Sequence, residues 1–438
     1  MINEINLTCK EICEAVEGEL IGEDAFISSL TTSSQESTKK PYCFFAIKGE
    51  KHNGADYIEE AISNGAKLIV TQEKKPHSVS TIYVKDTVKA LGLLGKKHKG
   101  KTKIIGVTGS NGKTTVKDMI LTVLKEKYRV CATNQNNNNE IGVAKTLLSI
   151  NKHDYCVVEM GMRGLGEIEW LSYICEPDIA VITNCSNAHI GRLGSEENIF
   201  KAKTEILKYT KAYAVLPSEE RFKSLEAGGL EHIFVGKNGD YNSDRIIKAN
   251  GVINFDINGK SFEINSISSH DVQNAMLSYA VGRLCGIEEY LIKNGLKKWK
   301  KARGRGEIME VNGIKIINDT YNASFESMRS AVEALAEYGK MGYKTAAVIG
   351  DMLEQGDKAE EYHFKIGELC KKMCIDKLLV SGEYSNQYIC GFGKGKKYKT
   401  IAEIADGIKE ELSPSYVVLI KASHAENYGE IISKLRES

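Results

Sequence analysis

Residues 106–115 read GVTGSNGKTT and stand between a short apolar run, Lys103–Ile105, and a helix-like segment, Val116–Tyr128. A strand, a glycine-rich turn and a helix in this order are typical of a phosphate-binding loop, because the turn aims successive backbone N–H groups at phosphate oxygens and the helix N-terminus adds positive charge. Lys113 would supply a mobile cation and Thr114 a magnesium ligand. The stretch therefore predicts a nucleotide-binding domain.

Composition limits the classes of fold and function. At 438 residues the chain is long enough for two to four domains. Lysine and arginine total 59 and aspartate and glutamate 58, so the near-zero net charge argues against a general nucleic-acid binder. Eleven cysteines, none in a C-x-x-C pair, fit a reducing compartment. The sequence contains no basic and apolar leader and no apolar run near the roughly 20 residues of a membrane-spanning helix. We expect a soluble, cytoplasmic protein with no membrane span and no nucleic-acid partner.

The first 98 residues alternate short helices and strands, which predicts a small α/β domain. The expected elements are a helix at Leu7–Val16, a strand at Cys43–Ile47, a helix at Ala55–Ser63 and a strand at Lys67–Val70. The hydroxyl-rich residues 31–38 are expected to form a solvated loop. The basic run Lys96–Lys101 is expected to be a solvated linker into the next domain.

Residues 99–306 are expected to form the nucleotide-binding domain, and polar residues end two of its apolar strands. Tyr155–Glu159 ends in a carboxylate and Ile179–Asn184 ends in an amide. Ligands of parallel sheets bind outside the carboxyl ends of the strands, so both side chains are expected beside the phosphate-binding loop. Glu159 would then hold a magnesium ion together with Thr114.

Three further features of this domain have a structural and a functional interpretation. The asparagine-rich residues 134–139 form either a polar loop or a contact to substrate or phosphate through Asn138 and Asn139. His189 follows the Ile179–Asn184 strand on the ligand side of the sheet, where a structural role and a ligand role are equally good explanations. Physical reasoning alone predicts that Lys203 lies on a helix surface, paired with a carboxylate.

Residues 307–438 repeat strand and helix in a pattern typical of a doubly wound domain with a mostly parallel sheet. Polar residues again follow the predicted strands, in the segments Asn318–Asn322, Gly350–Asp351 and Lys421–His424. By the same rule these segments form the ligand edge of this domain. We expect the two ligand edges to face each other across a cleft.

Together these segments resemble the Mur ligase family of ATP-dependent amide-forming enzymes. The resemblance extends in colinear order through the whole chain and is carried by Thr108–Thr115, Val158–Gly161 with Gly166–Ile168, Ala188–His189 with Leu193–Ser195, Lys201–Lys203, His270–Ala275, Arg305, Asn318–Ala323 with Ser327–Met328, and Gly350–Glu354. It is strongest to the members that join D-alanyl-D-alanine to UDP-N-acetylmuramoyl-tripeptide in peptidoglycan precursor synthesis, for cell wall biogenesis.

The resemblance implies three domains. They are an N-terminal domain for the UDP-sugar, residues 1–98, a central ATPase domain, residues 99–306, and a C-terminal Rossmann-like domain for the incoming amine, residues 307–438. It also implies a reaction in which ATP phosphorylates the terminal carboxylate of the muramoyl peptide and the amine then attacks the acyl phosphate. Since a carboxylate and a triphosphate are both anions, catalysis of this kind depends on charge neutralisation and positioning. We expect a monomer that binds ATP, two Mg²⁺ ions and both substrates.

The resemblance also assigns roles to individual residues. Lys113, His189, Lys203 and Asp319 would be catalytic, with Lys113 on the β- and γ-phosphates. The first Mg²⁺ would bind Thr114 and Glu159, and the second would bind His189 and a carbamylated Lys203. The nucleotide would contact the loop residues Gly109, Ser110, Asn111, Gly112 and Thr115, with Asn274 on adenine and Arg305, Asp319 and Tyr321 reaching across the domain boundary. The other substrates would contact Ser33, Ser34, Asn138, Asn139, Asn322, Asp351, Lys421 and Ser423.

The chain departs from the family pattern in its substrate-binding segments. Thr32-Ser33-Ser34 replaces the aspartate, hydroxyl residue and arginine of the uridine-binding loop, Ser324-Phe325 replaces asparagine and proline, and His424 replaces an arginine. Histidine cannot reproduce the bidentate carboxylate clamp of arginine. Two alternatives therefore accompany the leading hypothesis, namely an amide ligase of this type with a different acid or amine, and a nucleotide-dependent regulatory protein that has lost ligation.

Overall fold

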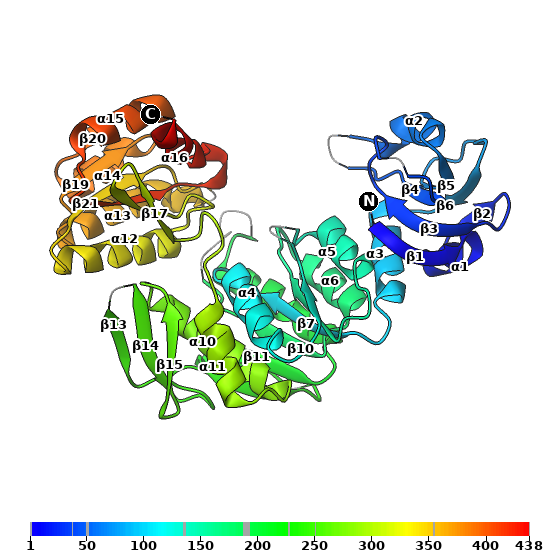
Figure 1. The fold of residues 1–438 in the computed structure, drawn as a ribbon, viewed down its shortest axis with the longest axis horizontal. Helices are drawn as coiled ribbons and strands as arrows, with labels where there is room; N and C mark the ends of the chain where they lie inside the picture. Colours follow the sequence, from blue (N-terminus) through cyan, green and yellow to red (C-terminus); the bar gives the residue numbers. More distant parts are fainter. Residues whose placement is uncertain are drawn as a thin grey trace.

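The computed structural model describes residues 2–36, 38–49, 52–134, 137–186, 193–226, 228–249, 251–353 and 355–437. Three α/β parts follow one another along the long axis of the molecule, each built on its own six-stranded sheet (Figure 1). A three-stranded sheet is added to the central part. The mixed α/β class with three domains is thereby confirmed.

The N-terminal part is a six-stranded sheet in the order β1-β3-β4-β5-β6-β2. Its strands are β1 (Ile2–Thr8), β2 (Glu19–Ile21), β3 (Phe26–Thr31), β4 (Tyr42–Phe45), β5 (Ala66–Thr71) and β6 (Ser80–Tyr83). Its helices are α1 (Cys9–Ala15), η1 (Gly54–Tyr57), α2 (Ile58–Ser63) and α3 (Thr87–His98). The sheet mixes parallel and antiparallel pairs, because β1 and β2 run antiparallel to their neighbours β3 and β6.

Two predictions in this part are wrong at their boundaries. The helix predicted from Leu7 begins at Cys9, because Leu7 and Thr8 pair with β3 and Thr8 caps the helix in a reciprocal hydrogen-bonded pair with Glu11. The loop predicted at residues 31–38 begins one residue later, because Thr31 is the last residue of β3. The hydroxyl of Thr31 is buried and donates to the Glu36 carboxylate, whereas the sequence suggested a solvated side chain.

The central part is built on an all-parallel sheet in the order β12-β11-β10-β7-β9-β8. Its strands are β7 (Lys103–Thr108), β8 (Val130–Ala132), β9 (Tyr155–Glu159), β10 (Ile179–Ile182), β11 (Tyr213–Pro217) and β12 (Glu231–Val235). Its helices are α4 (Lys113–Leu124), α5 (Glu140–Leu148), α6 (Glu167–Cys175), α8 (Glu196–Thr204), η2 (Glu205–Tyr209), α9 (Glu220–Lys223), α10 (His270–Leu284) and α11 (Glu289–Lys298). Apolar residues of α4, α10 and α11 pack in one core of this part, and those of α5, α6 and α8 in another.

The antiparallel sheet of the central part was not predicted. It comprises β13 (Ile246–Ala249), β14 (Val252–Ile257) and β15 (Lys260–Asn265). The alternating burial of β14 and β15 places Phe255 and Phe262 in the same core as Tyr279 of α10. This sheet therefore extends the hydrophobic core that supports α4 and α10, the two helices that begin beside the phosphate-binding loop.

The C-terminal part has a sheet in the order β16-β17-β21-β18-β19-β20, in which only β16 runs antiparallel to its neighbour. Its strands are β16 (Glu307–Val311), β17 (Ile314–Asn318), β18 (Lys344–Ile349), β19 (Lys377–Val380), β20 (Lys396–Lys397) and β21 (Tyr416–Lys421). Its helices are α12 (Phe325–Lys340), η3 (Gly356–Lys358), α13 (Ala359–Lys372), α14 (Ser385–Phe392), α15 (Ile401–Glu411), η4 (His424–Glu426) and α16 (Gly429–Arg436). Helices α12 to α14 and helices α15 and α16 contribute to separate cores of this part, as a doubly wound domain requires.

The basic run Lys96–Lys101 is not the solvated linker that was predicted. Residues 96–98 complete α3, and the ammonium groups of Lys96 and Lys99 each lie 3.1 Å from a carboxylate oxygen of Glu176, at the end of α6. Burial alone would raise the pKa of Glu176, but the hydrogen bonds and charges of the two lysines lower it to about 2. Glu176 thus fastens the last helix of the N-terminal part to the central part.

This attachment predicts a pH-dependent contribution to stability. Glu176→Gln is expected to lower the midpoint of thermal unfolding at pH 7 by about 2–4 °C, as expected for about 1 kcal/mol in a partly exposed ion-pair cluster. The folded pKa lies below the ordinary value of 4.5, so the contribution is complete above pH 4.5 and is lost as the pH falls toward 2. Calorimetry of the wild type and of Glu176→Gln from pH 7 to pH 3 measures the difference between their unfolding midpoints, which is expected to become smaller as the pH falls. Glu288→Gln serves as the matched control. Glu288 pairs with Lys127 and is more exposed than Glu176, so its replacement is expected to change the midpoint less.

Candidate functional site

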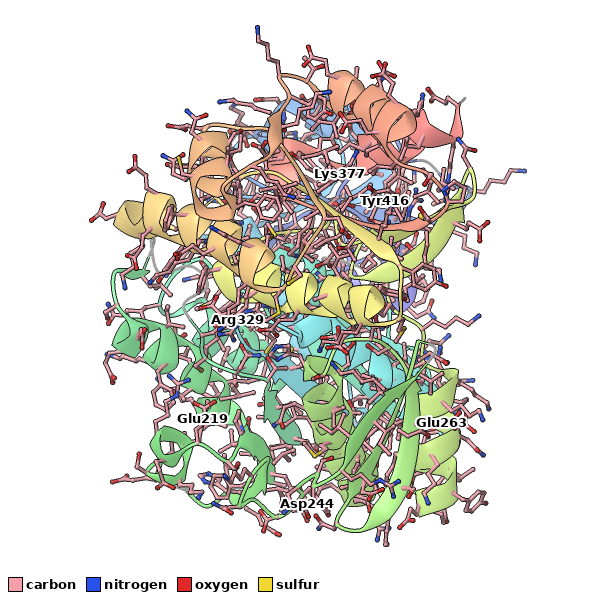
Figure 2. All side chains as sticks on the ribbon, turned by 90° about the vertical axis from the view of Figure 1, so that its left-hand side faces the viewer. Glu219, Asp244, Glu263, Arg329, Lys377 and Tyr416 are labelled. Carbon is pink, nitrogen blue, oxygen red and sulfur yellow. The ribbon has the colours of Figure 1, made fainter. Side chains whose placement is uncertain are left out.

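A cleft of about 900 Å³ lies between the central and C-terminal parts. The side-chain view shows α12 directly above the central part, with Arg329 at the boundary between them (Figure 2). One wall of the cleft consists of segments that follow β7, β9 and β10 and of the start of α10, and the other consists of segments that follow β17 and β21 and of α12. The prediction that the two ligand edges face each other is confirmed.

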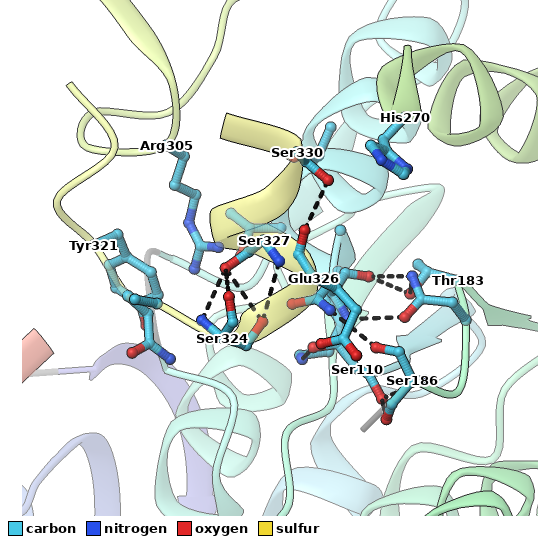
Figure 3. Close-up of a pocket in the computed structure, with 18 of the residues that line it drawn as sticks. Ser110, Thr183, Ser186, His270, Arg305, Tyr321, Ser324, Glu326, Ser327 and Ser330 are labelled. Atoms are coloured by element: carbon cyan, nitrogen blue, oxygen red, sulfur yellow. Dashed lines mark hydrogen bonds between the residues drawn. The ribbon is translucent and has the colours of Figure 1, made fainter. Parts of the chain in front are cut away.

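The phosphate-binding loop is held open by close packing against the end of β10. The φ angle of Gly109 is +145°, and a Cβ atom at this position would lie 1.9 Å from the hydroxyl oxygen of Thr183. The amide N–H of Ser110 donates to the carbonyl of Asn184 at 3.0 Å, and the N–H of Asn111 donates to the side-chain oxygen of Asn184 at 3.1 Å. The close-up shows Ser110 beside Thr183 and Ser186 (Figure 3). Asn184 therefore shapes the loop, as its predicted place beside the loop allows.

Lys113 is the first residue of α4 and turns back onto the loop. Its ammonium group donates to the carbonyl oxygens of Gly109 at 2.7 Å and Ser110 at 3.0 Å. The pKa of Lys113 is lowered to about 8, mainly by burial, against the opposing charge of Glu159 and with a smaller contribution from the charge of Arg305. The cation stands at the centre of the loop and lacks a direct carboxylate partner among the described residues.

Glu159 is a buried carboxylate at the end of β9, next to the phosphate-binding loop. The Thr114 hydroxyl donates to one of its oxygens at 2.8 Å and the side-chain amide of Asn138 donates to the other at 2.8 Å. The side chain of Asn139 does not face this group, because it caps α5 by accepting from the N–H of Gly142. Thr114 and Glu159 form a pair of hard oxygen donors, which suits Mg²⁺.

The prediction that Lys203 lies on a helix surface with a carboxylate partner is wrong. The residue lies on α8 with 0% of its surface exposed, and its ammonium nitrogen has no hydrogen-bond partner within the described ranges. Burial lowers the pKa of Lys203 well below 10.5, and the charge of Lys113 lowers it further. His189, its predicted partner, lies outside the described residues.

The C-terminal wall contributes an ion pair between a buried lysine and a half-buried aspartate, and a stacked cation. The ammonium of Lys421 lies 2.7 Å from the Asp319 carboxylate and donates to the carbonyl of Asn322 at 2.7 Å. The guanidinium carbon of Arg305 lies 3.7 Å from the centre of the Tyr321 ring, which also borders the cleft (Figure 3). These residues lie together on the wall opposite the phosphate-binding loop.

Other predicted residues lie elsewhere or have structural contacts. The carboxylate of Asp351 accepts from the N–H groups of Glu383 at 2.7 Å and Tyr384 at 3.2 Å and does not border the cleft. Ser33 and Ser34 belong to the N-terminal part and do not border it either. The Ser423 hydroxyl does border it and accepts from the N–H of Leu353 at 2.8 Å.

The structure also brings residues to the cleft that sequence reasoning did not assign. They are Arg163, Glu167, Asp271, Lys301, Glu326 and Arg329. Glu326 and Arg329 lie in the first turns of α12, which Ser324 caps in a reciprocal pair with Ser327 (Figure 3). The serine spacing of this cap was a usable signal for the start of the helix, but only the packing of α12 shows that it faces the cleft.

A phosphate-binding loop, a carboxylate-hydroxyl pair beside it and a second α/β domain across the same cleft define a P-loop nucleotide-binding protein. Residues 107–282 match the model of the Mur ligase middle domain, and residues 304–424 match that of the Mur ligase glutamate ligase domain. The chain belongs to the Mur ligase family. It therefore belongs to a family of ATP-dependent ligases.

Relatives extend the match to the whole chain. The UDP-N-acetylmuramoyl-tripeptide–D-alanyl-D-alanine ligase of Bacillus subtilis is 34% identical, with 99% of each chain covered, and that of Escherichia coli is 28% identical over 99% of each. A crystal structure of MurF from Acinetobacter baumannii covers 100% of both chains, with 27% identity and a TM-score of 0.92. That of the MurF ligase from Thermotoga maritima in complex with ADP covers 93% of this chain and 97% of its own, with 29% identity and a TM-score of 0.85.

None of the helices in the described part of the chain combines the length and apolar composition of a transmembrane span.

Lys113 provides a direct test of the phosphate-binding loop. Lys113→Ala is expected to weaken ADP binding about 100-fold, because a charge-assisted contact to phosphate is lost. The midpoint of thermal unfolding should change by less than about 2 °C, since the only described hydrogen bonds of the ammonium group are to carbonyls of its own loop. Titration calorimetry measures the affinity. Unchanged ADP affinity in a folded variant would show that the loop does not bind phosphate.

Proposed function

We propose that this protein joins D-alanyl-D-alanine to UDP-N-acetylmuramoyl-tripeptide and converts ATP to ADP and phosphate. Relatives of this name match it from end to end. The observation that carries the proposal is Lys203, a buried lysine whose nitrogen has no hydrogen-bond partner among the described residues and whose pKa is lowered by burial and by the charge of Lys113. A protein that only senses a nucleotide has no use for such a group, whereas an enzyme that activates a carboxylate needs further charge stabilisation next to the phosphates.

The proposed reaction has two steps. The carboxylate of the tripeptide attacks the γ-phosphorus of ATP, and the bond to the β-γ bridging oxygen breaks to give an acyl phosphate and ADP. The amine of the dipeptide then attacks the acyl carbon, and the tetrahedral intermediate expels phosphate and loses a proton to form the amide. Lys113 would bind the β- and γ-phosphates and so reduce the repulsion between the two anions.

The donor set beside the loop fits a magnesium ion. Thr114 and Glu159 would be its ligands, and Asn138 would keep the Glu159 carboxylate in place. When bound, the ion supplies positive charge to the β- and γ-phosphates. The Thr114 hydroxyl donates to one oxygen of Glu159 at 2.8 Å, so the two oxygens are close enough to bind the same ion.

Lys203 fits a carbamate better than a free ammonium. The nitrogen of its neutral amine would attack the carbon of carbon dioxide and release a proton, so that the side chain ends in an extended carboxylate. This reaction requires the neutral amine, which the lowered pKa of Lys203 favours. The carbamate and His189 would then hold a second Mg²⁺.

Both walls of the cleft would contribute to the nucleotide site. Asn274, Arg305, Asp319 and Tyr321 would complete the nucleotide site, and Asn322, Lys421 and Ser423 would contact the dipeptide. Asp351 would support the dipeptide site through its backbone carbonyl, which accepts from the N–H of Ser423 at 3.0 Å. Ser33 and Ser34 would contact the UDP-sugar in the N-terminal part. Asp319 is poised for its role by Lys421, which orients the carboxylate at 2.7 Å. We expect the enzyme to act as a monomer on these soluble substrates in the cytoplasm.

One assay tests the substrates. Phosphate release from ATP is expected only when UDP-N-acetylmuramoyl-tripeptide and D-alanyl-D-alanine are both present, and each is omitted in turn as the control. Release that needs a different acid or amine would assign the protein to another reaction of the same class. Tight ATP binding without release under any combination would support the regulatory alternative.

The carbamate has its own test. Wild-type protein incubated with ¹³C-bicarbonate is expected to show one carbamate carbon resonance that Lys203→Met lacks, because the unpaired amine is the reactive one. Lys117→Met is the matched control, since Lys117 is also a buried lysine but donates to the carbonyl of Thr133 at 3.0 Å and pairs with Asp118 at 2.9 Å. A resonance that persists in Lys203→Met would remove the carbamate from the proposal.

A further inference from the structure

A buried carboxylate beside the cleft has three donors, and none of the roles above uses it. Asp271 lies in the first turn of α10 and is 6% exposed. One of its oxygens accepts from the Ser266 hydroxyl at 2.6 Å and lies 2.9 Å from the ammonium of Lys301. The other accepts from the side-chain amide nitrogen of Asn274 at 3.1 Å. Asp271 therefore holds one end of the amide that was assigned to the base of the nucleotide.

This contact decides which way the Asn274 amide faces. A carboxylate only accepts hydrogen bonds, so the amide nitrogen must be the atom on Asp271. The side-chain oxygen of Asn274 then turns toward Gly112 in the phosphate-binding loop, where a Cβ atom would lie 2.8 Å from this oxygen and 3.4 Å from the nitrogen. Both residues border the cleft, and no hydrogen bond in the described part of the chain ends on the Asn274 oxygen.

We propose that Asp271 is a positioning residue that selects the base of the nucleotide. By holding the amide nitrogen of Asn274, it fixes the side-chain oxygen of Asn274 as the acceptor that faces the purine. The site then binds a purine with a 6-amino group, which donates to the Asn274 oxygen, and rejects one with a 6-oxo group, which would place two acceptors against each other. The inference rests on the proposed function in one respect, namely that Asn274 faces the base.

The other two donors make this orientation stable. Ser266 and Lys301 occupy the second oxygen of Asp271, so the first remains for Asn274. Lys301 comes from the segment between α11 and β16 that also carries Arg305. The connection to the C-terminal part thus supplies one donor of the group that orients the base contact.

Nucleotide binding by the full chain tests the proposal without any turnover. Titration calorimetry with Mg²⁺ is expected to show that the wild type binds ADP about 10- to 100-fold more tightly than inosine diphosphate, which differs at position 6 in carrying an oxo group. In Asp271→Asn the neighbouring side chain offers a donor or an acceptor, so Asn274 can turn over. The ratio is then expected to fall to within about 3-fold.

A matched variant separates base selection from general damage. Asp178 is also a structural aspartate of the central part, where it accepts from the N–H of Ile104 at 2.8 Å next to the amino end of β10, away from the cleft. Asp178→Asn is expected to keep the wild-type ratio. If Asp271→Asn keeps this ratio as well, or weakens both nucleotides equally, Asp271 has only a structural role and the proposal is overturned.

If Asp271→Asn does not fold, the wild type still tests the base contact that Asp271 is proposed to orient. The diphosphate of 2,6-diaminopurine riboside keeps the 6-amino group and is expected to bind like ADP, whereas that of unsubstituted purine riboside lacks this group and should bind about 10-fold more weakly. Equal binding of all these nucleotides overturns the inference but leaves the proposed function intact. A wild type that binds none of them overturns both.

Discussion

The parallel pairing of β7 with β9 fixes where the charges of the cleft stand. This register sets Val107 opposite Glu159, so a carboxylate ends its strand beside the start of the phosphate-binding loop. A buried carboxylate without partners would be costly, and Glu159 meets this constraint through the Thr114 hydroxyl and the Asn138 amide. The Glu159 carboxylate thereby connects β9, the loop that carries Asn138 and the start of α4, and these contacts hold the phosphate-binding loop in place without a ligand.

The two walls of the cleft divide the electrostatic work between two domains. The central part holds Lys113 and Lys203 in surroundings that disfavour their charge, whereas the C-terminal part holds Lys421 against Asp319. An anionic substrate would stabilise the charged forms of Lys113 and Lys203. At Lys421 it would instead compete with the carboxylate of Asp319. In the proposed reaction the phosphates would therefore bind to the central wall, and the C-terminal part would orient the other groups.

Sequence reasoning found the parts of the site that local rules determine. The glycine spacing of residues 106–115 and the polar ends of the parallel strands need only the chain geometry of a βα unit, and Glu159, Asn184, Asp319 and Lys421 all lie near the ends of their strands as expected. The burial of Lys203 depends on how α8 packs, which no short pattern encodes. The orientation of Asn274 is set by Asp271, whose second oxygen is held in turn by Lys301, a residue distant in sequence. Strands β13 to β15 were not predicted, although the alternating residues of β14 and β15 on either side of Asn258-Gly259 are a hairpin signal that local rules contain.

The close packing between the loop and the end of β10 has a consequence for how this chain can vary in evolution. Position 109 is confined to glycine twice, by its positive φ angle and by the hydroxyl of Thr183 in the space where a Cβ atom would go. Thr183 is confined in turn, since its hydroxyl donates to the carbonyl of Asn111 at 2.5 Å and a larger side chain would enter the loop. Position 109 therefore stays glycine whatever residue stands at position 183, and position 183 in turn accepts only a side chain small enough to pack against this glycine.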